Sequence, residues 1–182
     1  FYSEGYTILK DLEGKEPNPG HRALAAMQEE GFLHEIVTQN IDDLHQQGGA
    51  KNVLQVHGDA STARCGYCNY RTDFAEFDKQ VEAGNIPPKC PECGHDMRTN
   101  VGLFGDAMPP AFDAAVKAAE KADLILVVGS SLQVMPVAYL PRLAEHLIIV
   151  NQGSTPYDHQ ADVLFKGSAA DVLVELEKRL NE

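Results

Sequence analysis

Residues 123–131 read Asp-Leu-Ile-Leu-Val-Val-Gly-Ser-Ser, and this stretch indicates the fold most directly. The apolar run that ends at Val128 is typical of a strand buried on both faces of a parallel sheet. Gly129, Ser130 and Ser131 then form a turn of small residues, whose backbone N–H groups and hydroxyls suit a phosphate. Gly and Ser turns follow strands in many proteins, so this turn alone is weak evidence for a nucleotide site.

Strands and helices alternate on both sides of this stretch. The sequence predicts further strands at 35–37, 52–56, 100–104 and 147–150, and helices at 1–12, 43–47, 72–82, 110–122 and 169–180. One more helix begins with Asn18 as its cap and Pro19 in its first turn, and it stops at Gly31. The last helix starts with the capping pair Ser168 and Asp171, and its inward face comprises Val172, Leu173, Leu176 and Leu180. This alternation predicts an α/β protein with a Rossmann-like, doubly wound parallel sheet.

Polar side chains follow two of the predicted strands. Residues 38–45 read Thr-Gln-Asn-Ile-Asp-Asp-Leu-His, and His57-Gly58 comes directly after the strand at 52–56. Ligands of open α/β sheets bind at the carboxyl ends of the strands, so these groups are candidates for an active site. Two simpler interpretations stay open. Residues 38–45 could be a helix-capping loop, and His57 could be a structural histidine rather than a general base.

Four cysteines form two C-x-x-C pairs. The pairs are Cys65 with Cys68 and Cys90 with Cys93, and 21 residues separate them. This spacing predicts a closed four-thiolate zinc site, which stabilises structure and performs no chemistry. Two disulfides or a thioredoxin-like redox pair are the alternatives. The sequence therefore divides into a first Rossmann-like part (1–62), a zinc-binding insert (63–98) and a second Rossmann-like part (99–182).

Composition limits the class of partner. The 182 residues carry a net charge of −12 with only 15 Lys and Arg, which argues against nucleic acid or an anionic membrane surface. A cationic partner such as a lysine-rich tail is compatible with this charge, although solubility explains it equally well. No apolar run approaches the roughly 20 residues that a membrane-spanning helix needs. The compact core favours a prokaryotic, cytoplasmic enzyme.

These motifs, taken in order, resemble the sirtuin family of NAD-dependent protein deacylases. The resemblance extends from about Pro17 to the final helix. It rests on Thr38–Asp42 with Leu44-His45, His57-Gly58, the two C-x-x-C pairs, Phe104-Gly105-Asp106, Gly129-Ser130-Ser131-Leu132 and Asn151. Any one of these motifs could occur by chance, whereas six in the correct order are highly specific.

The resemblance implies an enzyme that transfers the acyl group of an acyl-lysine protein or peptide to ADP-ribose and releases nicotinamide. It places His57, Asn40 and Asp42 in catalysis, with His57 as the base. The implied NAD-binding residues are Gln39, Asn40, Ile41, Asp42, Gly129, Ser130, Ser131, Asn151, Gln152, Gly153 and Ala169. The implied peptide-binding residues are Gly102, Leu103, Phe104, Gly105, Asp106, Leu132 and Val134. An imidazole suits the role of base, because its unperturbed pKa is about 6.5.

Some features of the family pattern are changed or absent. Asp106 stands where Glu is common, Ser130 where Thr is common, and Asp59 where a small polar residue is usual. The glycine-rich G-A-G-x-S turn and the P-D-F-R loop of sirtuins do not occur in these 182 residues. The expectation is therefore an N-terminally incomplete form of an active enzyme, which alone binds NAD weakly and turns over little. A mono-ADP-ribosyltransferase on the same fold and a non-catalytic, zinc-stabilised peptide-binding module remain the alternatives.

Overall fold

The computed structural model describes residues 5–182, and contacts between residues divide the chain into two compact units. Unit 1 comprises residues 1–15, 39–43 and 57–107, and unit 2 comprises residues 16–38, 44–56 and 108–182. Residues 63–98 therefore lie entirely within unit 1. The same unit also contains the flanking residues 57–62 and 99–107 and the two earlier segments 1–15 and 39–43. The three-part division at 62/63 and 98/99 stays a prediction.

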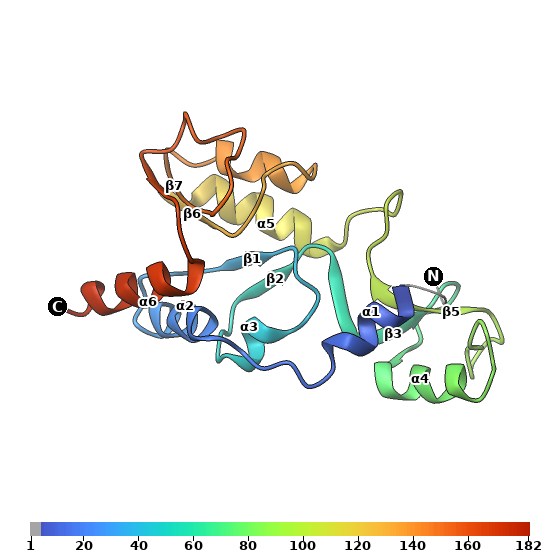
Figure 1. Ribbon diagram of the computed structural model, residues 1–182. Coiled ribbons are helices and arrows are strands. Elements are labelled where there is room, and N and C mark those ends of the chain that lie inside the picture. Colours follow the sequence, from blue (N-terminus) through green and yellow to red (C-terminus); the bar gives the residue numbers. More distant parts are fainter. Residues whose placement is uncertain (1–4) are drawn as a thin grey trace. The chain divides into compact units, whose positions relative to one another are not determined.

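Unit 1 contains an antiparallel sheet with the strand order β4-β3-β5. Its strands are β3 (Gly58–Cys65), β4 (Arg71–Asp73) and β5 (Met97–Val101). The helices α1 (Gly5–Leu12) and α4 (Phe74–Glu82) belong to the same unit (Figure 1).

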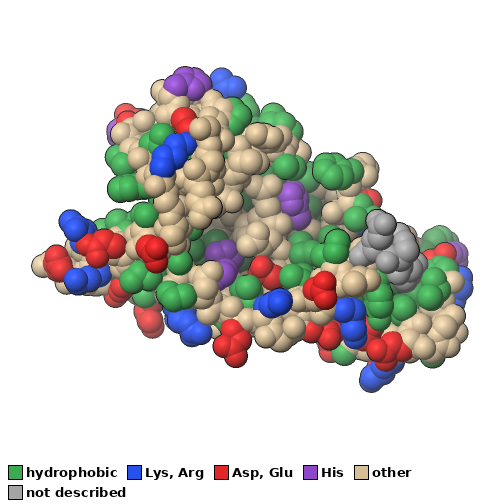
Figure 2. All heavy atoms as spheres, in the orientation of Figure 1, with side chains coloured by type: hydrophobic (Ala, Val, Ile, Leu, Met, Phe, Trp, Pro, Cys, Tyr) green, Lys and Arg blue, Asp and Glu red, His purple; other side chains and the backbone are tan. Residues whose placement is uncertain are grey.

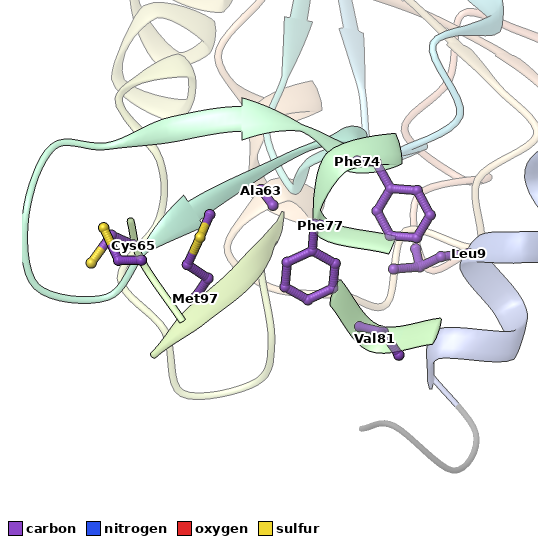
Figure 3. Packing of buried hydrophobic residues seen from close by; sticks show 8 residues of the cluster. Leu9, Ala63, Cys65, Phe74, Phe77, Val81 and Met97 are labelled. Carbon is purple, nitrogen blue, oxygen red and sulfur yellow. The ribbon is translucent and has the colours of Figure 1, made fainter. Parts of the chain in front are cut away.

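One hydrophobic core joins the helices and the sheet of unit 1. Phe74, Phe77 and Val81 lie on one face of α4, as their spacing of three and four residues predicts. Figure 3 shows Leu9 of α1 beside Phe74, and Met97 beside Cys65 of the first C-x-x-C pair. The expected helix at 1–12 is confirmed from Gly5 onward, whereas its first four residues, including Tyr2, lie outside the described part of the chain.

The predicted strand at 100–104 is wrong in its bounds and its neighbours. Strand β5 ends at Val101 and pairs with β3 in antiparallel orientation, so it belongs to unit 1 and not to the parallel sheet. Its burial alternates, with Met97 and Thr99 buried, which is the pattern of a half-buried strand. Leu103 and Phe104, which suggested an apolar strand, are 51% and 101% exposed.

Unit 2 contains the parallel strands. β1 (Ile36–Thr38) pairs with β2 (Val53–Gln55), and a second sheet has the order β6-β7-β8. The strands of that sheet are β6 (Leu124–Val128), β7 (His146–Val150) and β8 (Val163–Phe165). The helices are α2 (Pro19–Glu29), α3 (Leu44–Gln47), α5 (Pro110–Lys121), α6 (Ala169–Leu180) and the 3-10 helix η1 (Val137–Arg142). Parallel strands joined by helices confirm the predicted α/β class.

Helices α2 and α6 lie side by side (Figure 1), and both begin as predicted. The Asn18 side chain accepts a hydrogen bond from the His21 amide at 3.1 Å, and the His21 ring accepts one from the Asn18 amide at 3.2 Å. Ser168 accepts a hydrogen bond from the Asp171 amide at 3.4 Å. Gly20 allows the close approach of the two helices, because a Cβ there would lie 3.1 Å from the backbone of Ala170.

Two burial predictions in unit 2 are wrong. In β6 only Val127 is buried and Leu124 is 47% exposed, because β6 is an edge strand of the sheet that the described residues form. Leu180, expected on the inward face of α6, is 38% exposed, whereas Leu173 is buried against α2. Strand β8 was not predicted from the sequence, and its three apolar residues are exposed.

Candidate active site

The histidine pocket is a cavity of about 330 Å³ in unit 1. Its lining comprises Ile8, Leu12, Gln39, Asn40, Ile41, Asp42, His57, Val101 and Gly102. The two amides, the carboxylate and the imidazole that follow β1 and β2 in the sequence therefore share one cavity. An imidazole beside amide and carboxylate groups can bind and deprotonate a hydroxyl-bearing ligand.

Main-chain hydrogen bonds join the lining segments of the histidine pocket at the start of strand β3. The Ala60 amide donates to the carbonyl of Ile41 at 2.8 Å, and the Gly102 amide donates to the carbonyl of His57 at 2.8 Å. Glycine is required at position 58, where φ is +77° and a Cβ would lie 1.9 Å from the Asn100 carbonyl oxygen. The His57-Gly58 pair therefore combines a titratable side chain with a backbone that only glycine fits.

The glycine pocket is a second cavity, of about 230 Å³, in unit 2. Its lining comprises Gly129, Val150, Asn151, Gln152, Gly167 and Ala169. These residues lie at or after the carboxyl ends of β6, β7 and β8 or open α6, which is where α/β proteins bind nucleotides. Gly129 has a φ of +63°, a conformation that favours glycine, and its amide donates to the carbonyl of Val150 at 2.9 Å.

Three residues predicted with the glycine pocket lie outside its lining. Ser130 and Ser131 follow Gly129, and the Ser130 hydroxyl accepts a hydrogen bond from the Leu132 amide at 3.2 Å. The carbonyl of Gly153 accepts hydrogen bonds from the side chains of Asn151 and Lys166, both at 3.0 Å. The Gly153 carbonyl therefore fixes the orientation of the Asn151 amide beside the pocket.

An ion pair shapes the segment predicted to bind the peptide. The Arg98 guanidinium donates to both carboxylate oxygens of Asp106, and the Leu103 amide donates to the same carboxylate at 2.9 Å. The hydrogen bonds from Arg98 and Leu103 lower the pKa of Asp106 to about 2. Of the residues predicted for this role, only Gly102 lines the histidine pocket, and Leu132 is buried in the core with a φ of +53°. Val134 is 40% exposed.

The four cysteines converge as the spacing predicts. Their sulfurs lie within 4.8 Å of one another, and all four thiols are free. Disulfides are therefore not the arrangement found. Four converging thiolates form the ligand set of a closed zinc site.

The electrostatics of the cluster fit a bound cation. Amide hydrogen bonds from Cys68 and Tyr67 lower the pKa of the Cys65 thiol to about 6, against the opposing effect of burial. At Cys93, a hydrogen bond from the His95 amide is outweighed by burial and by the three neighbouring sulfurs, which raise the pKa to about 12. Four thiolates held this close repel one another, and a bound Zn²⁺ would compensate their charge.

Sequence reasoning missed five lining residues of the two pockets. Three of them, Ile8, Leu12 and Val101, are in the histidine pocket, and Val150 and Gly167 are in the glycine pocket. The apolar spacing of α1 indicates an amphipathic helix, yet it does not separate core residues such as Leu9 from lining residues such as Ile8. Contacts with distant segments decide that difference.

One face of the molecule shows how its charged side chains are distributed. On the face drawn in Figure 2, acidic side chains and Lys or Arg are interspersed and form no single basic patch. Among residues 5–182, no helix combines the length and the apolar character that crossing a bilayer requires.

Comparison with known proteins gives consistent matches. A family model described as Sir2 family matches residues 1–136. An NAD-dependent protein deacetylase of Caldanaerobacter subterraneus subsp. tengcongensis is 43% identical over 95% of this chain and 69% of its own length. An NAD-dependent protein deacylase of Thermococcus kodakarensis is 40% identical over 96% of this chain and 70% of its own length.

Solved structures agree with the sequence matches. A structure described as Sir2 with p53 peptide and NAD+ superposes with a TM-score of 0.91 at 32% identity, and it covers 100% of this chain and 80% of that one. A structure of Sir2 bound to acetylated peptide has a TM-score of 0.92 at 31% identity, and covers 100% of this chain and 81% of that one. The Rossmann-like α/β fold is therefore confirmed, and the clustered cysteines fit a structural zinc site.

Proposed function

The chain belongs to the Sir2 family, and we propose that it acts as an NAD-dependent protein deacylase. The reaction removes an acyl group from a lysine side chain, transfers it to ADP-ribose and releases nicotinamide. One observation supports this proposal above the others: Gln39, Asn40, Asp42 and His57 line a single cavity. These residues come from two separate segments of the chain, one after β1 and one after β2.

In the proposed reaction, His57 is the base that accepts a proton from a ribose hydroxyl. Asn40 and Asp42 bind and orient the ribose or a water molecule, and Gln39 and Ile41 complete the nicotinamide-ribose site. NAD, when bound, supplies the ribose carbon that the acyl oxygen attacks as nicotinamide departs. No protein nucleophile is required. This agrees with the position of the four cysteines, which all belong to the candidate metal site.

The glycine pocket is proposed to hold the phosphate and adenosine part of NAD. Support comes from its place at the carboxyl ends of three parallel strands and at the N-terminus of α6, where backbone N–H groups favour an anion. The residues assigned to this role are Gly129, Ser130, Ser131, Asn151, Gln152, Gly153 and Ala169.

The segment from Gly102 to Asp106 is proposed to bind the acyl-lysine peptide through main-chain hydrogen bonds. Leu103, Phe104 and Gly105 are exposed and lie outside any strand, so they are accessible to an extended peptide. Leu132 and Val134 are assigned to the same role. Strand addition of this kind takes affinity from the backbone and tolerates many peptide sequences.

The Cys65, Cys68, Cys90 and Cys93 cluster is proposed to bind Zn²⁺ for structural stability alone. We place the protein in the cytoplasm, and support for this comes from four cysteines that cluster as metal ligands and form no disulfide, since reducing compartments keep cysteines free for metal binding. Imaging of a tagged protein in its host cell tests the location.

The test of the proposed function is mass spectrometry of the products of the full-length protein with an acetyl-lysine peptide, with and without NAD. A deacylase removes the acetyl group from the lysine side chain of the peptide and forms O-acetyl-ADP-ribose, and it does so only when NAD is present. A mass gain of one ADP-ribose on a protein instead identifies a transferase. No change in either species, with NAD and peptide still bound, identifies a binding module.

A further inference from the structure

Asp59, two residues after His57, receives hydrogen bonds on both carboxylate oxygens. One oxygen accepts from the Thr62 amide at 2.8 Å, from the Thr62 hydroxyl at 2.6 Å and from the Ser61 hydroxyl at 3.2 Å. The other oxygen accepts from the side-chain amide of Asn100 at 2.6 Å. Since a carboxylate only accepts, the Asn100 side chain must present its NH₂ group to Asp59.

The Asp59 carboxylate spans an irregularity in the sheet. Between Gly58 and Ala63 the register of β3 against β5 shifts, so residues 59–62 lack regular pairing with β5. Asp59 replaces that pairing with a bond to Thr62 within β3 and a bond to Asn100 across to β5. Irregularities of this kind re-aim neighbouring side chains, and they occur preferentially beside active sites.

Three lining segments of the histidine pocket attach to the backbone next to Asp59. His57 lies two residues before it, and the His57 carbonyl accepts from the Gly102 amide. Ala60, the residue after Asp59, donates to the Ile41 carbonyl. Asn100, the partner of Asp59 on β5, lies two residues before Gly102. One carboxylate therefore connects the segments that carry His57, Ile41 and Gly102.

We infer that Asp59 is a positioning residue of the active site. It sets the mutual placement of the His57, Ile41 and Gly102 segments and takes no part in proton transfer. This inference rests on the proposed deacylase function. A misplacement of reacting groups by about 1 Å can cost about 100-fold in rate, so loss of the carboxylate lowers kcat by about 10- to 100-fold.

A reciprocal exchange tests the inference. Asn100→Asp places two carboxylates against each other, and Asp59→Ala removes the acceptor, so each variant lowers kcat by about 10- to 100-fold. The double variant Asp59→Asn with Asn100→Asp restores one donor and one acceptor in exchanged positions. It is expected to recover kcat to within about threefold of the parent.

Three measurements separate positioning from a general loss of folding. Ser61→Ala removes a bond to the same carboxylate that links no pocket segment, and its kcat stays within about twofold of the parent. Zinc content stays unchanged in all variants. ADP-ribose, whose proposed site is the glycine pocket in unit 2, binds each variant with an unchanged Kd.

The inference is overturned if Asp59→Ala and Asn100→Asp keep the parental kcat, or if the exchange variant fails to recover it. Amide hydrogen exchange at Ala60 and Gly102 gives a readout that needs no turnover. Its rate increases in Asn100→Asp and returns to the parental value in the double variant Asp59→Asn with Asn100→Asp. The parent could fail to deacylate while the variants still show this pattern of amide hydrogen exchange. In that case the proposed function fails and the positioning role of Asp59 stands.

Discussion

His57 is the residue on which the proposed reaction depends most. It lines the histidine pocket, and its carbonyl is bound by the Gly102 amide while its side chain remains available to a ligand. The chemistry requires a base that works near neutral pH, and no other histidine lines either described pocket.

His57→Tyr is expected to abolish deacylation and leave the fold intact, because a phenol that titrates near pH 10 cannot act as the base. Deacylation of an acetyl-lysine peptide, zinc content and thermal unfolding are measured together. His34→Tyr is the matched control, since His34 is exposed and belongs to neither pocket. Retained activity in the His57 variant would remove the base assignment.

Sequence reasoning found the chemically active residue types and missed their supports. Gln39, Asn40, Asp42 and His57 were identified because they follow two predicted strands and match motifs of the sirtuin family. The role of Asp59 was not predictable, because its bond to Asn100 depends on a register shift between β3 and β5. No local pattern encodes that register.

At the scale of the elements, the two C-x-x-C turns belong to the hydrophobic core of unit 1. The buried thiols of Cys65 and Cys90 belong to the same core as Phe77 and Met97. Strands β3 and β5 carry or flank these thiols and also lead to His57 and Gly102. Loss of the metal is therefore expected to weaken the packing around the histidine pocket as well as around the two C-x-x-C pairs.

Cys65→Ala is expected to lose zinc and to lower the unfolding temperature of unit 1, because three thiolates bind Zn²⁺ less tightly than four. Zinc is measured by elemental analysis and unfolding by calorimetry. Tyr67→Ala changes an exposed residue between Cys65 and Cys68, and this variant should keep its zinc. An active, zinc-free Cys65 variant would show that the metal is dispensable.

The loop before β8 provides a pH test in unit 2. Hydrogen bonds from Lys166 and Thr155 lower the pKa of Asp158 to about 2, from its usual value of 3.8. A carboxyl whose pKa is depressed in the folded state stabilises that state fully above pH 4, and this contribution disappears as the pH falls toward 2.

Asp158→Asn is therefore expected to unfold at a lower temperature than the parent at pH 6, and the difference should shrink as the pH falls from 4 toward 2. Measuring the difference between two proteins with the same zinc site cancels the effect of acid on the metal. A difference in unfolding temperature that stays constant over this range would contradict the assignment.

Elements with local signals were predicted well, and elements defined by pairing were not. Helices α2 and α6 begin at the predicted caps, because Asn18 and Ser168 satisfy amides only three residues away. Strands β4 and β8 have three residues each, and β3 is rich in small and polar residues. Pairing with distant strands, and not composition, makes these segments extended.

At the scale of the whole molecule, each unit is assembled from segments far apart in the sequence. The chain passes between the units at residues 15/16, 38/39, 43/44, 56/57 and 107/108. Residues 39–43 and 57–107 join the same unit, although residues 44–56 between them belong to the other. The sequence predicted the α/β class and the zinc insert, but this interleaving depends on long-range contacts that no local pattern reports.

The acyl transfer to ADP-ribose is tested most directly by the stoichiometry of one reaction. Full-length protein is incubated with NAD and an acetyl-lysine peptide, and nicotinamide, deacetylated peptide and O-acetyl-ADP-ribose are quantified over time. Coupled transfer predicts equal amounts of all three at every time point, and no nicotinamide release without the acyl group. Nicotinamide released without deacetylated peptide, or deacetylation without NAD, would contradict it.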